Sequence, residues 1–203
     1  MLSSSQFPIA RAPRAPRTQR RRTLRAFTLI EIVIAVAVLA LIVGVVAMRA
    51  GGLISKGKST SVLQLTDTLK VACASYHADT NQFPWEYSGY AATDRKLSGT
   101  QTIAGWSGPY LEKPLTNGSN PYGGTVHMYA YANVNGNDGF DTDADGTVDV
   151  TANACTLWFT GVPEAEAKAI DATLDKGLGG TANTGGRVEW NTSNQYMWIL
   201  VHF

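Results

Sequence analysis

The segment 141–149 carries the residues of this chain that are best suited to bind a metal ion. Oxygen donors recur there at nearly alternate positions. They are the side chains of Asp141, Asp143, Asp145 and Asp149, with a backbone carbonyl expected from Thr147. Gly146 permits a sharp turn, and the order matches the first nine positions of a Ca²⁺-binding loop. Carboxylates this close together repel one another unless a dication joins them, so we expect a structural calcium ion here.

The acidic segment also departs from the full calcium-loop pattern. Ala152 stands at the twelfth position, where a bidentate carboxylate is expected, and no pair of flanking helices is predicted. An isolated loop of this type is therefore the interpretation, and Asn137 or Asp138 could supply a missing ligand. The alternative is a solvated acidic turn between two strands.

Catalytic chemistry has little support in the sequence. His77, His127 and His202 lie in no nucleophile motif, and the chain has no phosphate-binding loop and no dinucleotide fingerprint. Cys73 and His77 are four residues apart, the spacing of neighbours on a helix face, but no second Cys or His cluster supports a soft-metal site. We therefore expect a protein that is not an enzyme.

Residues 1–26 form a basic leader that cannot belong to a folded core. The leader contains seven arginines, several Pro and Ser, and no Lys, Asp or Glu, which gives it a formal charge of +7. The remaining chain holds ten basic and 16 acidic residues, so the overall charge of +1 hides a mature charge of −6. A charge of this sign gives no indication of nucleic-acid binding. The composition, 44% hydrophobic and 16% charged, fits one globular domain with an appendage rather than a disordered chain.

The apolar run 27–48 follows the leader and contains a single charged residue, Glu31. As a helix it would span about 30 Å, the thickness of a bilayer core. The arginines that precede it predict a cytoplasmic N-terminus. A carboxylate within such a span costs roughly 2.5–3.5 kcal/mol and needs a partner.

Three ordinary interpretations leave this run partly unexplained. A cleaved secretory signal needs a shorter apolar region and a small-residue cleavage site after it, whereas the Ala35–Ala37 pair lies in mid-span. A twin-arginine signal, suggested by Arg21 and Arg22, has the same length problem. A plain membrane anchor fits the length, but like the twin-arginine signal it does not explain Glu31.

The stretch 25–31, Arg-Ala-Phe-Thr-Leu-Ile-Glu, resembles the processing site of type IV pilins and type II secretion pseudopilins. The resemblance implies that a prepilin peptidase cuts between Ala26 and Phe27, and that the new amine of Phe27 is methylated. Glu31 then becomes the fifth residue of the mature chain, where it would face the N-terminal ammonium of a neighbouring subunit in a filament. The sequence departs from the family at Ala26, since Gly normally precedes the cut.

The rest of the chain predicts the α+β pilin fold, in which a long N-terminal helix packs against an antiparallel sheet. Residues 27–50 form the membrane-spanning and assembly helix, and 51–79 continue it as an amphipathic helix, with a bend or a locally melted turn expected at Gly51-Gly52. Residues 80–203 form the head. A Gly/Pro-rich connection covers 80–124, strands are expected at 125–133, 155–160, 186–190 and 196–203, and a helix at 163–176.

Two further expectations depend on the resemblance. Export of the head to an oxidising compartment implies that Cys73, on the helix, and Cys155, on a strand, pair as a disulfide, with two buried free thiols as the alternative. Major pseudopilins carry a structural calcium near the C-terminal end of the head, and by analogy the resemblance supports a calcium ion at the segment 141–149. The segment 106–111, Trp-Ser-Gly-Pro-Tyr-Leu, resembles secretion pseudopilins, whereas the added helix and last strands resemble type IV pilins.

The predicted function is that of a structural subunit of a pilus or a secretion filament, held in the bacterial inner membrane with its head in the periplasm or at the cell surface. The expected partners are copies of itself, other pilins, the prepilin peptidase, the inner-membrane assembly platform and the membrane. The alternatives are a single-pass, calcium-stabilised binding protein that does not polymerise, and a periplasmic enzyme exported by a cleaved signal.

Overall fold

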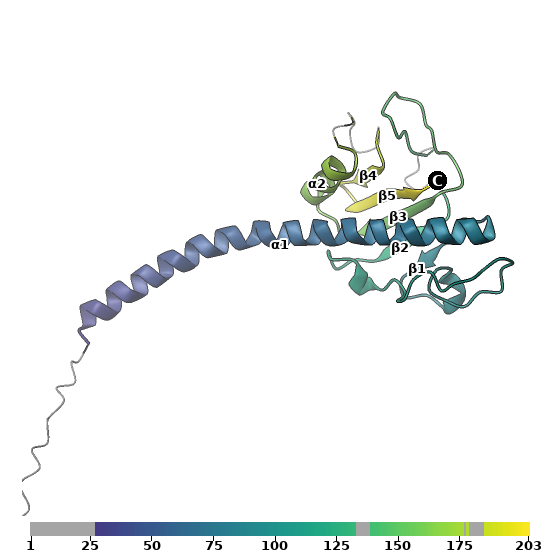
Figure 1. Ribbon diagram of the computed structural model, residues 1–203. Helices are drawn as coiled ribbons and strands as arrows, with labels where there is room; N and C mark the ends of the chain where they lie inside the picture. The colour runs from purple at the N-terminus through teal and green to yellow at the C-terminus, as the bar shows by residue number, and fades with distance from the viewer. Residues whose placement is uncertain (1–26, 133–138, 177, 179–184) are drawn as a thin grey trace, which may run out of the picture. The chain divides into compact units, whose positions relative to one another are not determined.

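The computed structural model describes residues 27–132, 139–176, 178 and 185–203 of the chain (Figure 1). The chain divides into two compact units, 1–46 and 47–203, and each is considered by itself. The leader 1–26 and the two suggested ligands Asn137 and Asp138 lie outside the described residues.

Helix α1 (Leu29–Thr80) begins within the first unit, where its apolar side chains have no cover. Phe27 is 77% exposed and Leu29 is 84% exposed, and all the described side chains as far as residue 47 are exposed as well. The helix is long and apolar enough to cross a membrane, and none of its most apolar window is buried by the protein. Burying this much apolar surface requires lipid or the helices of other subunits.

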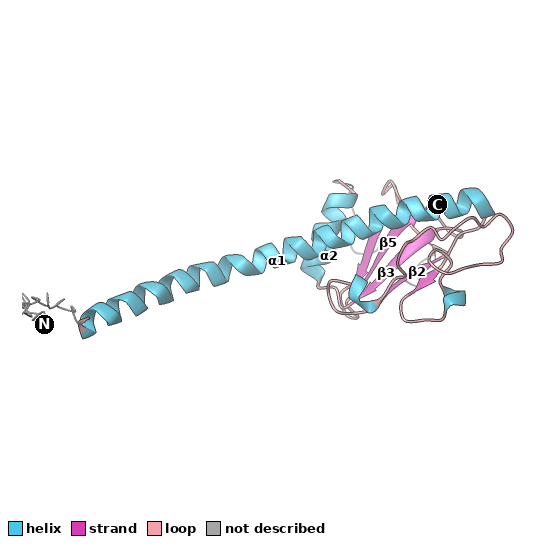
Figure 2. Cartoon of the chain, turned by 60° about the horizontal axis from the view of Figure 1, so that its bottom comes forward, coloured by secondary structure: helices cyan, strands magenta, loops and turns pink. Residues whose placement is uncertain are grey.

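In the second unit, the amphipathic part of α1 packs on one face of the sheet, as Figure 2 shows. Its buried stripe follows the helical spacing that was predicted, with Val62, Leu69, Ala72, Cys73 and Tyr76 in the core. The melted turn suggested at Gly51-Gly52 is absent, because both glycines lie within the continuous helix. The α+β prediction of a long helix on an antiparallel sheet is confirmed.

Five antiparallel strands form the sheet in the order β1-β2-β3-β5-β4. Their bounds are β1 Glu86–Tyr87, β2 Val126–Tyr129, β3 Cys155–Thr160, β4 Val188–Asn191 and β5 Tyr196–His202. The four predicted strands are present, and β3 has the predicted bounds. Strand β1 lies inside the segment 80–124 that was predicted as a connection, because two residues are too short to show an alternating pattern.

Strand β5 is apolar on both faces, and the structure shows why. Met197, Ile199 and Val201 face the core beneath α1. Trp198 and Leu200 face the opposite side, where a second cluster forms with Phe140, Val150 and neighbouring residues of the segment 132–154. This second cluster attaches the acidic segment to the sheet.

Helix α2 (Glu164–Leu174) lies beside β4 (Figure 1). The buried carboxylate of Asp175 joins the end of the helix to the start of the strand. Asp175 is 7% exposed, and its Oδ2 accepts hydrogen bonds from the backbone N–H groups of Arg187 (2.9 Å) and Val188 (3.2 Å). Its Oδ1 accepts no hydrogen bond from the described residues. Burial, followed by the hydrogen bond and charge of Asp175, raises the pKa of Asp171 to about 6. A protonated Asp171 is thus placed to donate to Asp175.

We expect the Asp171→Asn substitution to stabilise the head near neutral pH. Because the folded-state pKa lies above its usual value, folding binds a proton, and the free energy of unfolding falls as the pH rises from about 4 through 6. The amide of the variant keeps a donor for Asp175 and removes the charge repulsion between residues 171 and 175. We expect the free energy of unfolding to rise by about 1 kcal/mol at pH 7.5, after allowance for solvent screening, and to change little at pH 4. Urea unfolding at the two pH values measures this difference. The exposed Asp67→Asn variant is the control, and an equal effect of Asp171→Asn at both pH values would contradict the expectation.

Candidate functional site

The predicted processing residue Phe27 and the predicted assembly residue Glu31 lie at the start of α1, while Ala26 lies outside the described residues. Phe27 and Thr28 precede the helix, and Glu31 lies in its first turn. Thr28 Oγ1 accepts a hydrogen bond from Glu31 N at 3.3 Å, and Glu31 Oε2 accepts longer ones from Thr28 N (3.4 Å) and Thr28 Oγ1 (3.5 Å). A carboxylate at this position also interacts favourably with the positive end of the helix dipole.

This arrangement is a capping box, and the sequence analysis missed it. Its signal is the spacing Thr28-x-x-Glu31, in which each side chain satisfies a backbone N–H at the helix start. Glu31 therefore has a structural role within one chain, which is to cap the N-terminus of α1. The bonds are long and solvent-exposed, so the carboxylate remains accessible to a partner outside the chain.

The acidic loop is held at its base by the second core cluster. Phe140 and Val150 pair as an isolated antiparallel bridge and are both buried. Gly139 has φ 139°, and a Cβ there would meet the carbonyl of Val150, so only glycine fits at this point. Asp141 follows directly, and its carbonyl accepts a hydrogen bond from Gly186 N at 2.7 Å. The loop is thus positioned by apolar packing and by backbone pairing.

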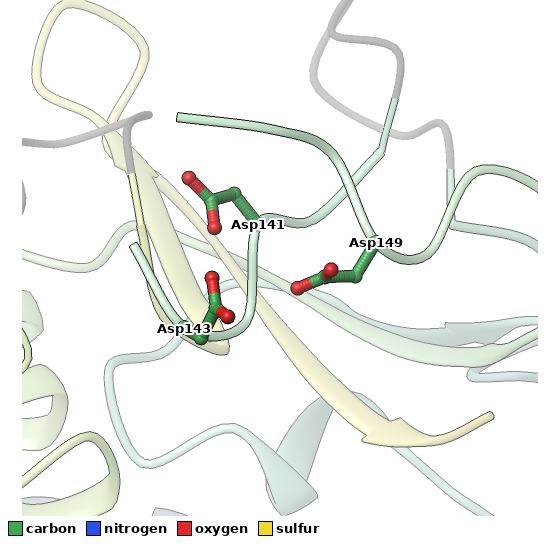
Figure 3. A group of neighbouring side chains, drawn as sticks. All are labelled: Asp141, Asp143 and Asp149. Carbon is green, nitrogen blue, oxygen red and sulfur yellow. The ribbon is translucent and has the colours of Figure 1, made fainter. Parts of the chain in front are cut away.

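Three of the four predicted aspartates converge. Asp141, Asp143 and Asp149 each offer one carboxylate oxygen, and these oxygens lie within 4.8 Å of one another (Figure 3). Since Ca²⁺ binds oxygen at 2.3–2.6 Å, ligands on opposite sides of the ion are about 5 Å apart, so the three oxygens have suitable spacing. Asp145 is not in this group, and its Oδ1 accepts the N–H of Thr147 at 2.7 Å.

Backbone hydrogen bonds already shape the loop around these carboxylates. Asp141 accepts the N–H groups of Asp145 (3.3 Å) and Gly146 (2.8 Å), and Asp149 accepts the N–H and hydroxyl of Thr142 at 2.8 and 2.6 Å. The hydroxyl bond, then the backbone bond, lowers the pKa of Asp149.

Asp143 differs from Asp149, because the charges of the neighbouring aspartates raise its pKa. A backbone hydrogen bond from Asp145 lowers its pKa, but desolvation and the charges of Asp145, Asp149 and Asp141 together raise it above its usual value. The net repulsion is of the kind that a bound cation relieves. The donor set of three carboxylates therefore fits a hard dication.

The cysteines differ from the predicted disulfide, since Cys73 and Cys155 are both free, buried thiols. The sulfur of Cys73 contacts the thioether of Met128 at 3.2 Å. The pKa of the Cys73 thiol is raised, chiefly by burial. The hydrogen bond and charge of Cys155 and the charge of Glu86 raise it further. The two thiols are thus neighbours in the core, and both pack as small apolar side chains.

Two family models match the chain. One, described as the prokaryotic N-terminal methylation motif, matches residues 21–47, and the other, described as PilW, C-terminal, matches residues 53–141. Strands β3, β4 and β5 and helix α2 lie outside both matches. Neither a curated protein nor a solved structure matches the chain. These families indicate a structural, type IV pilus-related protein with a single N-terminal membrane anchor. The helix-on-sheet fold agrees with both matches, and together they support a type IV pilin and pseudopilin-like family for this chain.

Proposed function

We propose that this protein is a subunit that polymerises through residues 27–50 into a type IV pilus or a type II secretion filament. The observation that carries the proposal is the methylation motif placed directly on a helix whose apolar side chains the protein leaves exposed. Lipid covers that surface before assembly, and the corresponding helices of other subunits cover it afterwards. Both environments suit the same apolar side chains, so the transfer between them costs little.

Glu31 supplies the specificity of the polymer in this proposal. Its carboxylate is costly in lipid, and in the filament it pairs with the methylated ammonium of Phe27 in a neighbouring subunit. The pair fixes the axial position of one helix against the next, as buried polar groups do in other helix assemblies. The proposed partners are therefore copies of this chain and related pilins, with the inner-membrane assembly platform and the prepilin peptidase acting before them. The head lies in the periplasm or on the filament surface.

We also propose that Asp141, Asp143 and Asp149 hold a structural calcium ion, with the carbonyl of Thr147 as a further candidate ligand. Bound calcium would neutralise the crowded carboxylates and fix the loop against the sheet. The proposal rests on the suitable spacing of the three oxygens and on the repulsion that raises the pKa of Asp143.

The mature N-terminus tests the processing step. We expect mass spectrometry of the purified membrane-bound protein to find a chain that begins at N-methylated Phe27. Substitution of Ala26 by Gly, the usual residue of the family, should increase the cleaved fraction, whereas Ala26→Leu should abolish it because the larger side chain does not fit a site adapted to glycine. A wild-type chain that retains its leader in cells with an active prepilin peptidase would contradict the proposal.

A second candidate function is a single-pass, membrane-anchored protein with a calcium-stabilised head and no polymer. The Thr28–Glu31 capping box favours it, because it provides Glu31 with hydrogen bonds within one chain. An intact leader and no filaments would be the result expected from this candidate.

A further inference from the structure

The sheet face opposite α1 carries a continuous row of aromatic rings. Alternation along the strands places these residues there, because His127 pairs with Trp158, and Trp158 with Trp198, across neighbouring strands. Neighbouring ring centroids in the row are 5.1–6.2 Å apart. We define the aromatic row by these residues: Tyr87, Tyr90, His127, Tyr129, Tyr131, Trp158, Tyr196 and Trp198.

A pocket of about 420 Å³ opens within the row. Its lining consists of Tyr87, Tyr90, Thr125, His127, Tyr129 and Trp158. None of these residues is charged at neutral pH, and Tyr90 at its edge is 55% exposed. The volume is within the range of sites for small organic ligands, which are lined by aromatic side chains with a few fixed polar groups.

The polar groups of the pocket are neutral hydrogen-bond donors. His127 Nδ1 accepts the N–H of Ser88 at 3.1 Å, so the proton of the neutral ring is on Nε2. Burial lowers the pKa of His127, which keeps the ring uncharged at neutral pH. Burial, then the neighbouring tyrosines, raises the pKa of Tyr129 to about 12, so its hydroxyl stays protonated.

This chemistry discriminates between classes of ligand. A nucleic acid also stacks on aromatic rings, but its phosphates need a groove lined with Lys or Arg, and the mature chain has a charge of −6. A purely apolar ligand would leave the imidazole and phenol groups without partners. A sugar ring offers both matching features, since its C–H face packs on aromatic rings and its hydroxyls exchange hydrogen bonds with such groups.

We propose that the pocket and the accessible members of the aromatic row bind a neutral oligosaccharide. Trp198 is buried in the second core cluster, so it supports the ring of Tyr196 and does not itself contact the ligand. One pyranose ring occupies the pocket against Trp158 and Tyr87, with its hydroxyls toward His127 and Thr125. The following rings extend along the row toward Tyr196. Because the row continues past the pocket, affinity rises with the number of sugar units. A filament subunit with this site would attach to a neutral glycan.

Ligand-observed NMR on the full-length protein, in a detergent without a sugar headgroup, tests the proposal. The probes are glucose, cellohexaose and maltohexaose, with a single-stranded dodecathymidylate as the charged comparison. We expect one of the hexasaccharides to bind, and to bind more tightly than glucose or the oligonucleotide. The edge variant Tyr90→Ala should weaken that binding about tenfold or more. Phe203→Ala, which removes an exposed aromatic ring outside the pocket, should change it by no more than about twofold.

Several results would overturn the proposal. They are the absence of binding by both hexasaccharides, equal binding by Tyr90→Ala and the parent, and a preference for the oligonucleotide. Concentration-dependent association of the protein that Tyr90→Ala abolishes, without hexasaccharide binding, would instead assign the row to a protein interface. Tyr90 is exposed and is not part of either core cluster, so the variant is expected to fold.

Discussion

Cells that produce the Glu31→Ala variant should process and insert the protein normally but form no filaments. Removing the carboxylate from the span lowers the cost of insertion, so the amount of membrane-bound protein should not fall. In the filament, however, the substitution leaves the ammonium of Phe27 without its partner. Breaking a buried pair in this way costs about 3–5 kcal/mol, which lowers the affinity of each subunit for the polymer more than a hundredfold. Shearing and sedimentation of filaments, with immunoblots of the membrane fraction, measure both quantities.

The capping box provides a matched control for this experiment. Thr28→Val removes the two hydrogen bonds that the Thr28 hydroxyl makes with Glu31 Oε2 and Glu31 N, but it leaves the carboxylate and its bond from Thr28 N in place. Loss of a cap costs about 1 kcal/mol, which is too little to abolish assembly. Filaments should therefore persist in Thr28→Val and vanish in Glu31→Ala. If both variants form filaments in normal amounts, Glu31 has no role in assembly. If both lose them equally, its role is to cap the helix.

The sequence predicted the fold well where a residue pattern is both long and consistent. The alternation in Cys155–Thr160 has the period of a strand and defined β3 to the residue. The apolar residues on both faces of β5 agree with its place between β3 and β4, where both faces are covered. The melted turn suggested at Gly51-Gly52 was wrong because glycine lowers helix stability by only about 1 kcal/mol, which a long helix tolerates.

The site was less predictable, because side-chain direction depends on the turns that carry it. The one-dimensional spacing counted Asp145 with the other three aspartates, but the loop turns its carboxylate to the N–H of Thr147. Ala144 has φ 60° and Gly146 has φ 92°, and these two left-handed residues decide which carboxylates converge. The aromatic row was equally hidden, since most of its members come from β1, β2, β3 and β5 and meet through strand pairing, while Tyr90 and Tyr131 come from the segments that follow β1 and β2.

The second large effect expected is on the stability of the head when calcium is removed. If free Ca²⁺ is present at about 100 times Kd, binding stabilises the folded state by about 2.7 kcal/mol. Chelation should then lower the Tm of a head of this size by about 5–10 °C. Differential scanning calorimetry of the detergent-solubilised protein, with calcium and with a chelator, measures the shift. Magnesium should restore little of it, because Mg²⁺ demands shorter bonds and keeps its own waters.

Substitutions within the loop separate a bound ion from simple charge repulsion. Asp143→Asn and Asp149→Asn each remove a converging carboxylate, so both should nearly abolish the shift in Tm caused by the chelator. Asp145→Asn removes the same charge at a residue outside the converging group, so most of the shift should remain. If the acidic loop is only a solvated turn, each of the three variants has the same Tm with and without the chelator. A parent protein whose Tm is unchanged by the chelator would remove calcium from the account, and Asp141 would then serve only to hold the backbone of Asp145 and Gly146.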